Sequence, residues 1–386
     1  MILPDVVLYQ LDNQKLRTYI LDNFLVQCFV NLGDVFEKVT RPACILIFRE
    51  SAEKLGIVKV GDLSNLGKSD KPRKLADDSL FQEYPLKKIR EIPGTLFITK
   101  ELRSYAIWTK ANQIPNRLLE SLVDQDGIQR GVSPDLKEAF LVDSKTASAW
   151  GLERQKLRKV LVGGKHVKRY LIERPDLYVI YTNRADNFKE LPNIRKYIDQ
   201  FKGQITCREV LDKKHPIYAL HRPREKHIFL KPQKLIGVIT GDEIIVALDE
   251  EQLFATDGLY LFGLKDKIDI KYIMGLLNSR LFVFLYRLLA LETGRVMAQV
   301  KPTILNELPI RVIDFTDRVE VKIHSQFVKL VEQMLSLKNQ FKNATVLHEK
   351  TFVQRQIDTT SRQVDQLAYE LYDLTEDEIK IVEDAA

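Results

Sequence analysis

The sequence contains few cysteines, and they lie far apart. Cys28, Cys44 and Cys207 form no Cys-x-x-Cys pair. This spacing disfavours a structural zinc site and a disulfide framework, and it is typical of a protein in a reducing compartment. We therefore expect no bound metal and a cytoplasmic location.

Long apolar runs and a secretory leader are also missing. No stretch of about 18 uncharged apolar residues occurs, so no transmembrane helix is predicted. The N-terminus has no basic stretch, apolar core and small-residue cleavage site in sequence. We expect a protein that does not use a membrane as a partner.

The remaining composition is that of an ordinary globular protein. Of 386 residues, 45% are hydrophobic and 29% are charged, which argues against extensive disorder. A chain of this length is expected to form two or three domains.

The charge is distributed unevenly. The whole chain has 59 Lys and Arg against 53 Asp and Glu, a net charge of +6. Residues 153–234 contain 21 basic and 9 acidic side chains, a net +12, whereas residues 316–386 contain 9 and 13, a net −4. A basic segment of this size indicates a polyanion such as double-stranded DNA as partner. The alternative is a solvated lysine-rich surface without a partner.

The N-terminal segments indicate an incomplete α/β domain. Helical spacing over residues 12–25 is followed by the apolar run Ala43–Phe48, which predicts a strand buried on both faces of a sheet. Because a doubly wound domain needs more chain, we interpret residues 1–60 as the remnant of a Rossmann-like domain. Residues 61–125 form a less regular bridge, in which Asn112–Val123 is predicted to be helical with Pro115 in its first turn.

Residues 126–315 are predicted to form a mixed α/β domain. Turn residues separate six short β-like runs: Lys159–Val162, Leu177–Tyr181, Ile228–Leu230, Leu235–Thr240, Glu243–Leu248 and Gly258–Phe262. The apolar segment Ile270–Ala290 predicts a core helix.

Residues 316–386 are predicted to be helical. Heptad-like seams run from Ile323 to Phe341 and from Val353 to Leu371, which indicates either a helical hairpin or one long helix. Thr375-Glu376-Asp377-Glu378 has the pattern of a capping box that begins a last short helix. The predicted fold class is therefore α+β.

Several collinear segments resemble the C-terminal part of TaqI-like adenine-specific DNA methyltransferases, as found in type IIG restriction–modification proteins. Lys15–Arg49 resembles the end of the catalytic domain, and Gly127–Asp143 resembles the opening of the target-recognition domain. The stretches VGGKHVKRY (162–170), MGLLNSRLFVF (274–284) and QVKPTILNELP (299–309) are similar to internal signatures, and residues 364–383 resemble the closing helical segment. His166 departs from this pattern, because the family usually has an acidic residue there.

The resemblance implies a methyltransferase chemistry that these residues do not supply. Neither Asn-Pro-Pro-Tyr nor Asp-Pro-Pro-Tyr, the motif that grips the flipped adenine, occurs in the chain, and no Gly-rich loop follows an N-terminal strand to bind S-adenosylmethionine. We therefore expect no catalytic residue and no cofactor here. Both are expected on an upstream part or on a separate methyltransferase or nuclease polypeptide.

The candidate DNA-binding residues follow from the basic segment and from the resemblance. Arginine binds guanine bidentately in the major groove, and both Arg and Lys bind phosphate. We predict contacts from Arg130, Lys165, Lys168, Arg169, Arg208, Lys213, Lys214, Tyr218, Arg222, Arg224, Lys226, Arg295 and Lys301. Gly163-Gly164-Lys165 is either a phosphate-binding backbone turn or a plain hairpin turn.

Other chemistry has weaker support. Three histidines between His215 and His227 lack a nearby cysteine, so a zinc site is not expected. The acids Asp242-Glu243 and Asp249-Glu250-Glu251 lack a following Glu-x-Lys, so we interpret them as exposed turn residues and not as a nuclease centre. Asn278, Ser279 and Arg280 are expected to be structural.

The leading hypothesis is a DNA target-recognition module of a restriction–modification methyltransferase. The alternative is a specificity-subunit-like scaffold, in which the helical tail binds a partner and the basic segment binds nothing. A third interpretation, a truncated active methyltransferase, would be decided by the coding sequence upstream of Met1.

Overall fold

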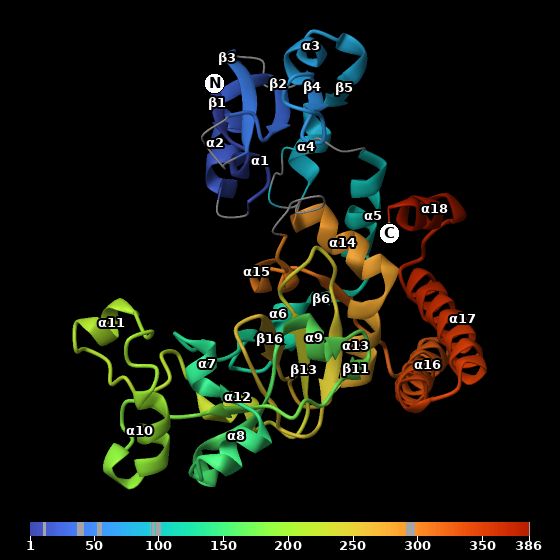
Figure 1. The fold of residues 1–386 in the computed structure, drawn as a ribbon. Coiled ribbons are helices and arrows are strands. Elements are labelled where there is room, and N and C mark those ends of the chain that lie inside the picture. Colours follow the sequence, from blue (N-terminus) through green and yellow to red (C-terminus); the bar gives the residue numbers. More distant parts are fainter. Residues whose placement is uncertain are drawn as a thin grey trace. The chain divides into compact units, whose positions relative to one another are not determined.

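The computed structural model of the protein describes residues 1–10, 13–36, 42–51, 56–92, 94, 97, 102–290 and 298–385. Contacts between residues divide the chain into two compact units (Figure 1). Unit 1 comprises residues 1–116, 284–296 and 372–386, and unit 2 comprises residues 117–283 and 297–371. The boundaries expected at residues 60, 125 and 315 were drawn from sequence pattern and remain predictions.

Unit 1 is built on a five-stranded sheet with the order β1-β3-β2-β4-β5. Its strands are β1 (Ile2–Pro4), β2 (Phe24–Gly33), β3 (Ala43–Glu50), β4 (Ile57–Asp62) and β5 (Gln82–Pro85). All neighbouring pairs are antiparallel except β2–β4, which is parallel. Strand β3 was expected to be buried on both faces, but Ile47 at its centre is 47% exposed, so one face is partly open.

The α-helices that lie wholly in unit 1, among its described residues, are α1 (Val6–Tyr9), α2 (Gln14–Asn23), α3 (Lys71–Leu75), α4 (Leu86–Glu91), α5 (Leu102–Gln113) and α18 (Glu376–Asp384). Arg17 on α2 is fully buried and donates hydrogen bonds to the carbonyl oxygens of Val7, Gln10 and Gly94. Lys110 of α5 pairs with Glu378 of α18 at 2.7 Å. Thr375 and Glu378 form the predicted capping box.

The helix expected over Asn112–Val123 does not form. Helix α5 ends at Gln113, and the chain continues as β6 (Asn116–Leu118) and the one-turn α6 (Leu119–Leu122). Because a proline disfavours helical geometry at the residue before it, Pro115 marks the end of a helix here and not its first turn.

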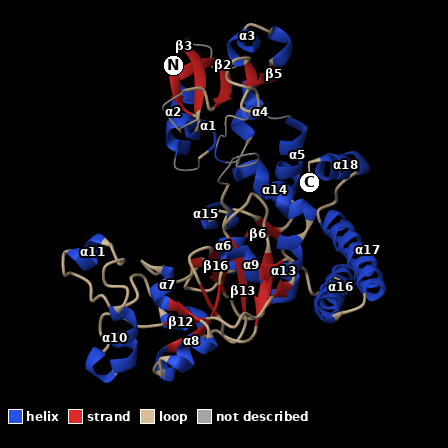
Figure 2. Cartoon of the chain, in the orientation of Figure 1, coloured by secondary structure: helices blue, strands red, loops and turns tan. Residues whose placement is uncertain are grey.

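The centre of unit 2 consists of short sheets, drawn in red in Figure 2. One sheet has the order β14-β13-β16-β7, with β14 (Val246–Asp249), β13 (Lys234–Val238), β16 (Leu259–Phe262) and β7 (Gln129–Arg130). A second has the order β15-β9-β12-β8, with β15 (Phe254–Ala255), β9 (Leu157–Leu161), β12 (Tyr178–Ile180) and β8 (Leu141–Val142). Two-stranded pairs are β10 (Val167–Lys168) with β11 (Leu171–Ile172), and β17 (Pro309–Arg311) with β6.

Unit 2 also contains the short helices α7 (Lys137–Phe140), α8 (Ser144–Ala149), α9 (Gly163–His166), α10 (Pro192–Asp199), α11 (Arg208–Leu211), α12 (Lys226–Phe229) and α15 (Pro302–Leu305). The predicted strand Ile228–Leu230 is wrong, because its first two residues belong to the helical turn α12. Three apolar residues are too few to distinguish a strand from a buried turn. Each of the other five predicted runs overlaps a strand.

The apolar segment Ile270–Ala290 forms two helices and not one. Helix α13 (Ile270–Asn278) and helix α14 (Arg280–Ala290) meet at Ser279 with a bend of 66°. The Ser279 hydroxyl donates to the Leu276 carbonyl oxygen at 2.7 Å. Within the described part of the chain, no single helix is long and apolar enough to cross a membrane, and this bent pair passes on length and composition alone.

The tail of unit 2 is the helical hairpin that the heptad pattern allowed. Helix α16 (Arg318–Asn343) and helix α17 (Leu347–Leu371) are joined by three residues. Their buried side chains include Phe327, Val331 and Met334 on α16 and Val353, Ile357 and Val364 on α17. The mixed α/β architecture with C-terminal helices confirms the predicted fold class.

Candidate nucleic-acid interface

Six segments of unit 2 meet where its central strands end. Several strands end at this edge: β7, β9, β13 and β15. Strand β16 begins there, because it runs antiparallel to β13 and β7, whereas β9 and β15 run parallel to each other. We call these segments the rim: residues 130–133, 162–165, 222–224, 239–242, 256–258 and 298–301. Five predicted DNA contacts lie on the rim: Arg130, Lys165, Arg222, Arg224 and Lys301. The acidic side chains in these segments are Asp242 and Asp257.

Backbone hydrogen bonds hold the rim segments together. The Thr256 amide donates to the Leu161 carbonyl at 3.0 Å, and the Val300 amide donates to the Ile239 carbonyl at 2.7 Å. Ser133 and Arg222 exchange two backbone hydrogen bonds, each 3.1 Å long. The rim is therefore a defined surface and not a set of independent loops.

Glycine allows the close packing of this edge. A Cβ atom on Gly131 would lie 2.1 Å from the Ala255 carbonyl oxygen, so no other residue fits there without a backbone shift. Gly241 has a φ of +119°, a conformation that side chains strongly disfavour. Small residues at a sheet edge also let another backbone approach closely.

Arg224 lies near two other arginines of the rim, Arg130 and Arg222. Burial, followed by repulsion from Arg222 and Arg130, lowers the pKa of the Arg224 guanidinium, and Asp257 opposes the shift. The carboxylate of Asp257 also accepts a hydrogen bond from the Ser133 hydroxyl at 2.6 Å. Two other arginines thus repel the Arg224 guanidinium and one carboxylate attracts it, which leaves net positive charge for a polyanion to neutralise.

Arg208, Lys213 and Lys214 lie away from the rim, on and after α11 in the segment that projects beside α10 in Figure 1. We call residues 187–218 the outer lobe. All three side chains are exposed, and two of them pair weakly with Asp212, Arg208 at 3.8 Å and Lys214 at 3.5 Å. Such exposed cations suit phosphate contacts more than base contacts.

Tyr218 is engaged inside the outer lobe. Its hydroxyl donates to Asp199 at 2.7 Å, and the cationic groups of Arg195 and Lys202 lie 5.4 and 5.7 Å from its ring centroid. The ring therefore organises cations of this lobe, an arrangement that sequence spacing could not predict.

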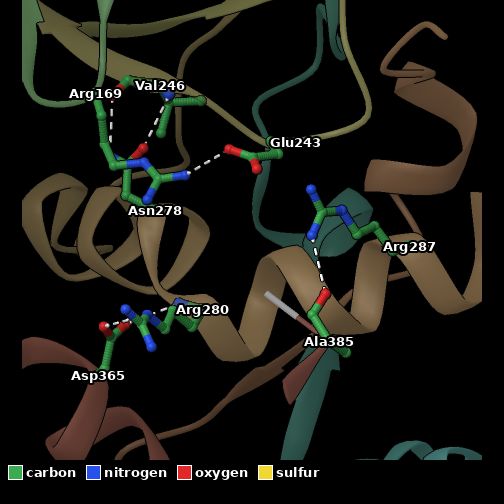
Figure 3. A network of polar contacts seen from close by, with 8 residues as sticks. All are labelled: Arg169, Glu243, Val246, Asn278, Arg280, Arg287, Asp365 and Ala385. Carbon is green, nitrogen blue, oxygen red and sulfur yellow. Dashed lines mark hydrogen bonds and ion pairs between the residues drawn. The ribbon is translucent and has the colours of Figure 1, made fainter. Parts of the chain in front are cut away.

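The remaining predicted contacts are distributed elsewhere. Lys168 and Lys226 are exposed on β10 and α12. Arg169 pairs with Glu243 at 3.3 Å (Figure 3), so its charge is partly compensated. Arg295 lies outside the described residues.

Gly163-Gly164-Lys165 begins the one-turn helix α9 and is not a hairpin turn. The Val162 amide donates to Nδ1 of the buried His166 at 2.9 Å, so the residue that departs from the family pattern closes this turn. Burial lowers the pKa of His166, which favours the neutral ring that this bond requires.

His215 and His227 make separate structural contacts, and the His221 ring packs edge-on against the His215 ring with centroids 5.6 Å apart. His215 accepts from Arg184 Nε at Nδ1, at 2.8 Å, so its Nε2 is the protonated nitrogen facing the Ala219 carbonyl at 2.9 Å. His227 lies 2.9 Å from Asp126. Among the described residues, no group of three or more His, Cys, Asp or Glu side chains could hold a metal ion.

The acid cluster at residues 249–251 is not wholly an exposed turn. Asp249 is buried and pairs with the buried Lys234 on the neighbouring strand, which corrects the expectation that all these acids are exposed. It also accepts hydrogen bonds from the backbone amides of Glu251 and Leu253 at 2.9 and 3.0 Å. Its role is therefore internal pairing.

Polar side chains at the α13–α14 junction are structural, as expected. The Asn278 amide group bonds both backbone groups of Val246, at 3.1 and 2.9 Å, and thereby completes the edge strand β14 (Figure 3). The Arg280 backbone amide donates to Asp365 on α17 at 2.8 Å. In unit 1, Arg287 on α14 donates to the Ala385 carbonyl at 3.1 Å.

Residues 159–310 match the model of the TaqI-like C-terminal specificity domain. This part of the chain, which supplies most of the rim, is a specificity domain of that family, as the sequence motifs indicated. No curated protein matches the chain.

The solved structures that match this chain include two restriction enzymes. The type IIL restriction-modification enzyme MmeI in complex with DNA has a TM-score of 0.53 at 11% identity, covering 98% of this chain and 47% of that one. The type IIG restriction endonuclease BpuSI has a TM-score of 0.39 at 12% identity, covering 96% and 47%. At such identities the likeness to MmeI shows the fold alone. The chain spans about half the length of these enzymes.

Proposed function

We propose that this chain recognises a specific sequence in double-stranded DNA on behalf of a restriction–modification adenine methyltransferase. The main support for the proposal is that the specificity-domain match and the basic segment fall on the same part of the chain. The specificity-domain match at residues 159–310 covers most of the basic segment 153–234 and most of the rim.

The proposed mechanism has two stages. The exposed cations of the outer lobe, together with Lys168 and Lys226, contact phosphates and release condensed counterions. The rim then contacts base edges, since phosphate contacts position a protein while base contacts give specificity. In this scheme Tyr218 and Arg169 position neighbouring groups, because both are already engaged.

The chemical step is proposed to occur outside these residues. Adenine methylation requires that the base leave the duplex and enter an S-adenosylmethionine-dependent pocket. The chain lacks the Asn-Pro-Pro-Tyr and Asp-Pro-Pro-Tyr motifs, so that pocket would belong to another polypeptide or to another part of the same protein. Whether cleavage accompanies methylation depends on that part.

Duplex binding over a salt series tests the proposal. The full chain is titrated against a fluorescent duplex of random sequence between 50 and 200 mM salt. If six or more phosphates are contacted, affinity should fall by about 1,000-fold or more over this range. Absent or salt-insensitive binding would contradict the proposal.

A scaffold role has one observation in its favour. At the tip of the α16–α17 hairpin, Val346, Leu347 and Phe352 are 60%, 80% and 58% exposed. If the helical tail binds a partner and the basic segment binds nothing, the full chain should not bind DNA. Replacing Arg222 and Arg224 with glutamate should then leave capture of the partner methyltransferase unchanged. Loss of duplex binding on the same replacement favours DNA recognition instead.

A further inference from the structure

We propose that Arg224 is a base-recognising residue that binds the major-groove edge of a guanine in the target, whereas the outer-lobe cations bind phosphate. The inference rests on the proposed duplex recognition and assigns a task to one side chain of the rim.

The first argument is that the Arg224 backbone is held in an unusual conformation. Its φ is +58°, in the left-handed region that residues other than glycine seldom adopt. The Tyr181 hydroxyl donates to its carbonyl oxygen at 2.8 Å, and two residues earlier Arg222 is bridged to Ser133. Strained positions that the surroundings enforce are concentrated at functional sites.

The second argument is the burial and hydrogen bonding of the Arg224 side chain. Arg224 is half-buried, and its Nε donates to the Gly131 carbonyl oxygen at 3.3 Å. Neither terminal guanidinium nitrogen has a hydrogen-bond or ion-pair partner among the residues that the structure describes. The guanidinium is thus held at one nitrogen while its two outer nitrogens remain available as a fork.

This arrangement suits guanine better than phosphate. Guanine presents two acceptors, N7 and O6, on its major-groove edge, and the arginine fork donates to both at once. Holding Nε in advance reduces the freedom that the side chain loses on binding. A phosphate contact does not need such orientation, because charge alone attracts it from many directions.

The contrast with Arg208 is direct. The side chain of Arg208 is 91% exposed, and its ion pair with Asp212 is 3.8 Å long. Arg130 and Arg222 are also exposed, and among the residues described neither has a side-chain contact that would orient it. Their charges raise the potential around Arg224, so a ligand with two acceptor atoms would be strongly attracted there.

The experiment compares base preferences of variants by selection from a duplex library with randomised positions. Arg224→Gly removes the side chain and accepts the left-handed backbone, Arg224→Lys keeps the charge without the fork, and Arg208→Ala is the control. A melting curve for each variant confirms that it folds.

The wild-type chain is expected to enrich guanine at one or more fixed positions. Both Arg224 variants should lose the preference at one of these positions, by about 5- to 150-fold, and keep the others. Arg224→Lys should retain the salt dependence of binding. Arg208→Ala should weaken binding to all sequences equally.

The outcomes separate the two proposals. Unchanged guanine preference in both Arg224 variants overturns the role of Arg224 while duplex recognition stands. If Arg224→Gly weakens binding to all sequences equally and Arg224→Lys behaves as the wild type, Arg224 contacts phosphate. This result also overturns the proposed recognition of guanine by Arg224. Failure of the wild-type chain to bind any duplex overturns both proposals.

Discussion

Lys234 and Asp249 form a fully buried ion pair between neighbouring strands of unit 2. Their side chains are 0% and 1% exposed, and the Lys234 ammonium also donates to the Phe229 carbonyl at 2.7 Å. Burial lowers the pKa of Lys234, whereas Asp249 favours its charged form. Such a pair fixes the register of β13 against β14 at a cost in desolvation.

Removing one partner of this pair should be costly. Lys234→Met leaves the Asp249 carboxylate buried without its counter-charge, so we expect the free energy of unfolding to fall by about 3–5 kcal/mol. Urea denaturation measures the change. Lys214→Met, which breaks an exposed pair with Asp212 (side chains 72% and 42% exposed), should cost less than about 1 kcal/mol. Equal losses in the two variants would contradict this account.

At the scale of elements, α13 and α16 pack unusually closely. A Cβ atom on Gly275 of α13 would lie 2.4 Å from a ring atom of Phe327 and 2.6 Å from a methyl group of Val331. Glycine inside a helix is intrinsically unfavourable, so its presence here reflects the contact that it permits. This contact is one of those that join the hairpin of α16 and α17 to the rest of unit 2.

Gly275→Ala tests the closeness of that packing. The added methyl group should displace α16 and lower the free energy of unfolding by about 1–3 kcal/mol, despite the better helix propensity of alanine. Thermal melting gives the result. Gly203→Ala, where the structure has nothing within 4 Å of the new Cβ, is the control and should be nearly neutral. A stabilised Gly275→Ala protein would show that the packing is looser than described.

Elements with a long periodic signal were predictable, and those that depend on tertiary contacts were not. The heptad seams and the Thr375–Glu378 capping box predicted the tail, because both signals are local. The break at Ser279 was missed, since the helix period continues across it in the sequence. The strand predicted at Ile228–Leu230 was wrong because three apolar residues carry no period.

The arrangement of the rim also depends on tertiary contacts that the sequence does not reveal. Arg130 and Arg224 are 94 positions apart, and they become neighbours only through the pairing of β7 with β16 and the bridge between Ser133 and Arg222. Sequence composition indicated a basic region and nominated its residues. It could not show that Tyr218 and Arg169 are already engaged, nor that Arg224 is held in place.

At the scale of the whole molecule, the positive charge belongs to unit 2. The +12 segment, residues 153–234, lies entirely within it, and so do all predicted DNA-binding residues except Arg295. The acidic excess of residues 316–386 lies in residues 372–386 of unit 1, which contain 1 basic and 6 acidic side chains, whereas residues 316–371 of unit 2 contain 8 basic and 7 acidic side chains. A DNA duplex would therefore be attracted to the sheets and outer lobe of unit 2 in preference to the hairpin.

The salt dependence of duplex binding in two charge-matched variants tests this claim most directly. Each neutralised phosphate contact contributes about 0.9 to the slope of log K against log salt concentration. Arg208→Ser/Lys213→Ser in the outer lobe should therefore reduce the slope by about 1.8, while Lys350→Ser/Arg355→Ser at exposed positions of α17 should leave it unchanged. If the outer-lobe variant keeps the wild-type slope, or if the α17 variant loses as much, the outer lobe is not the surface that contacts the phosphates.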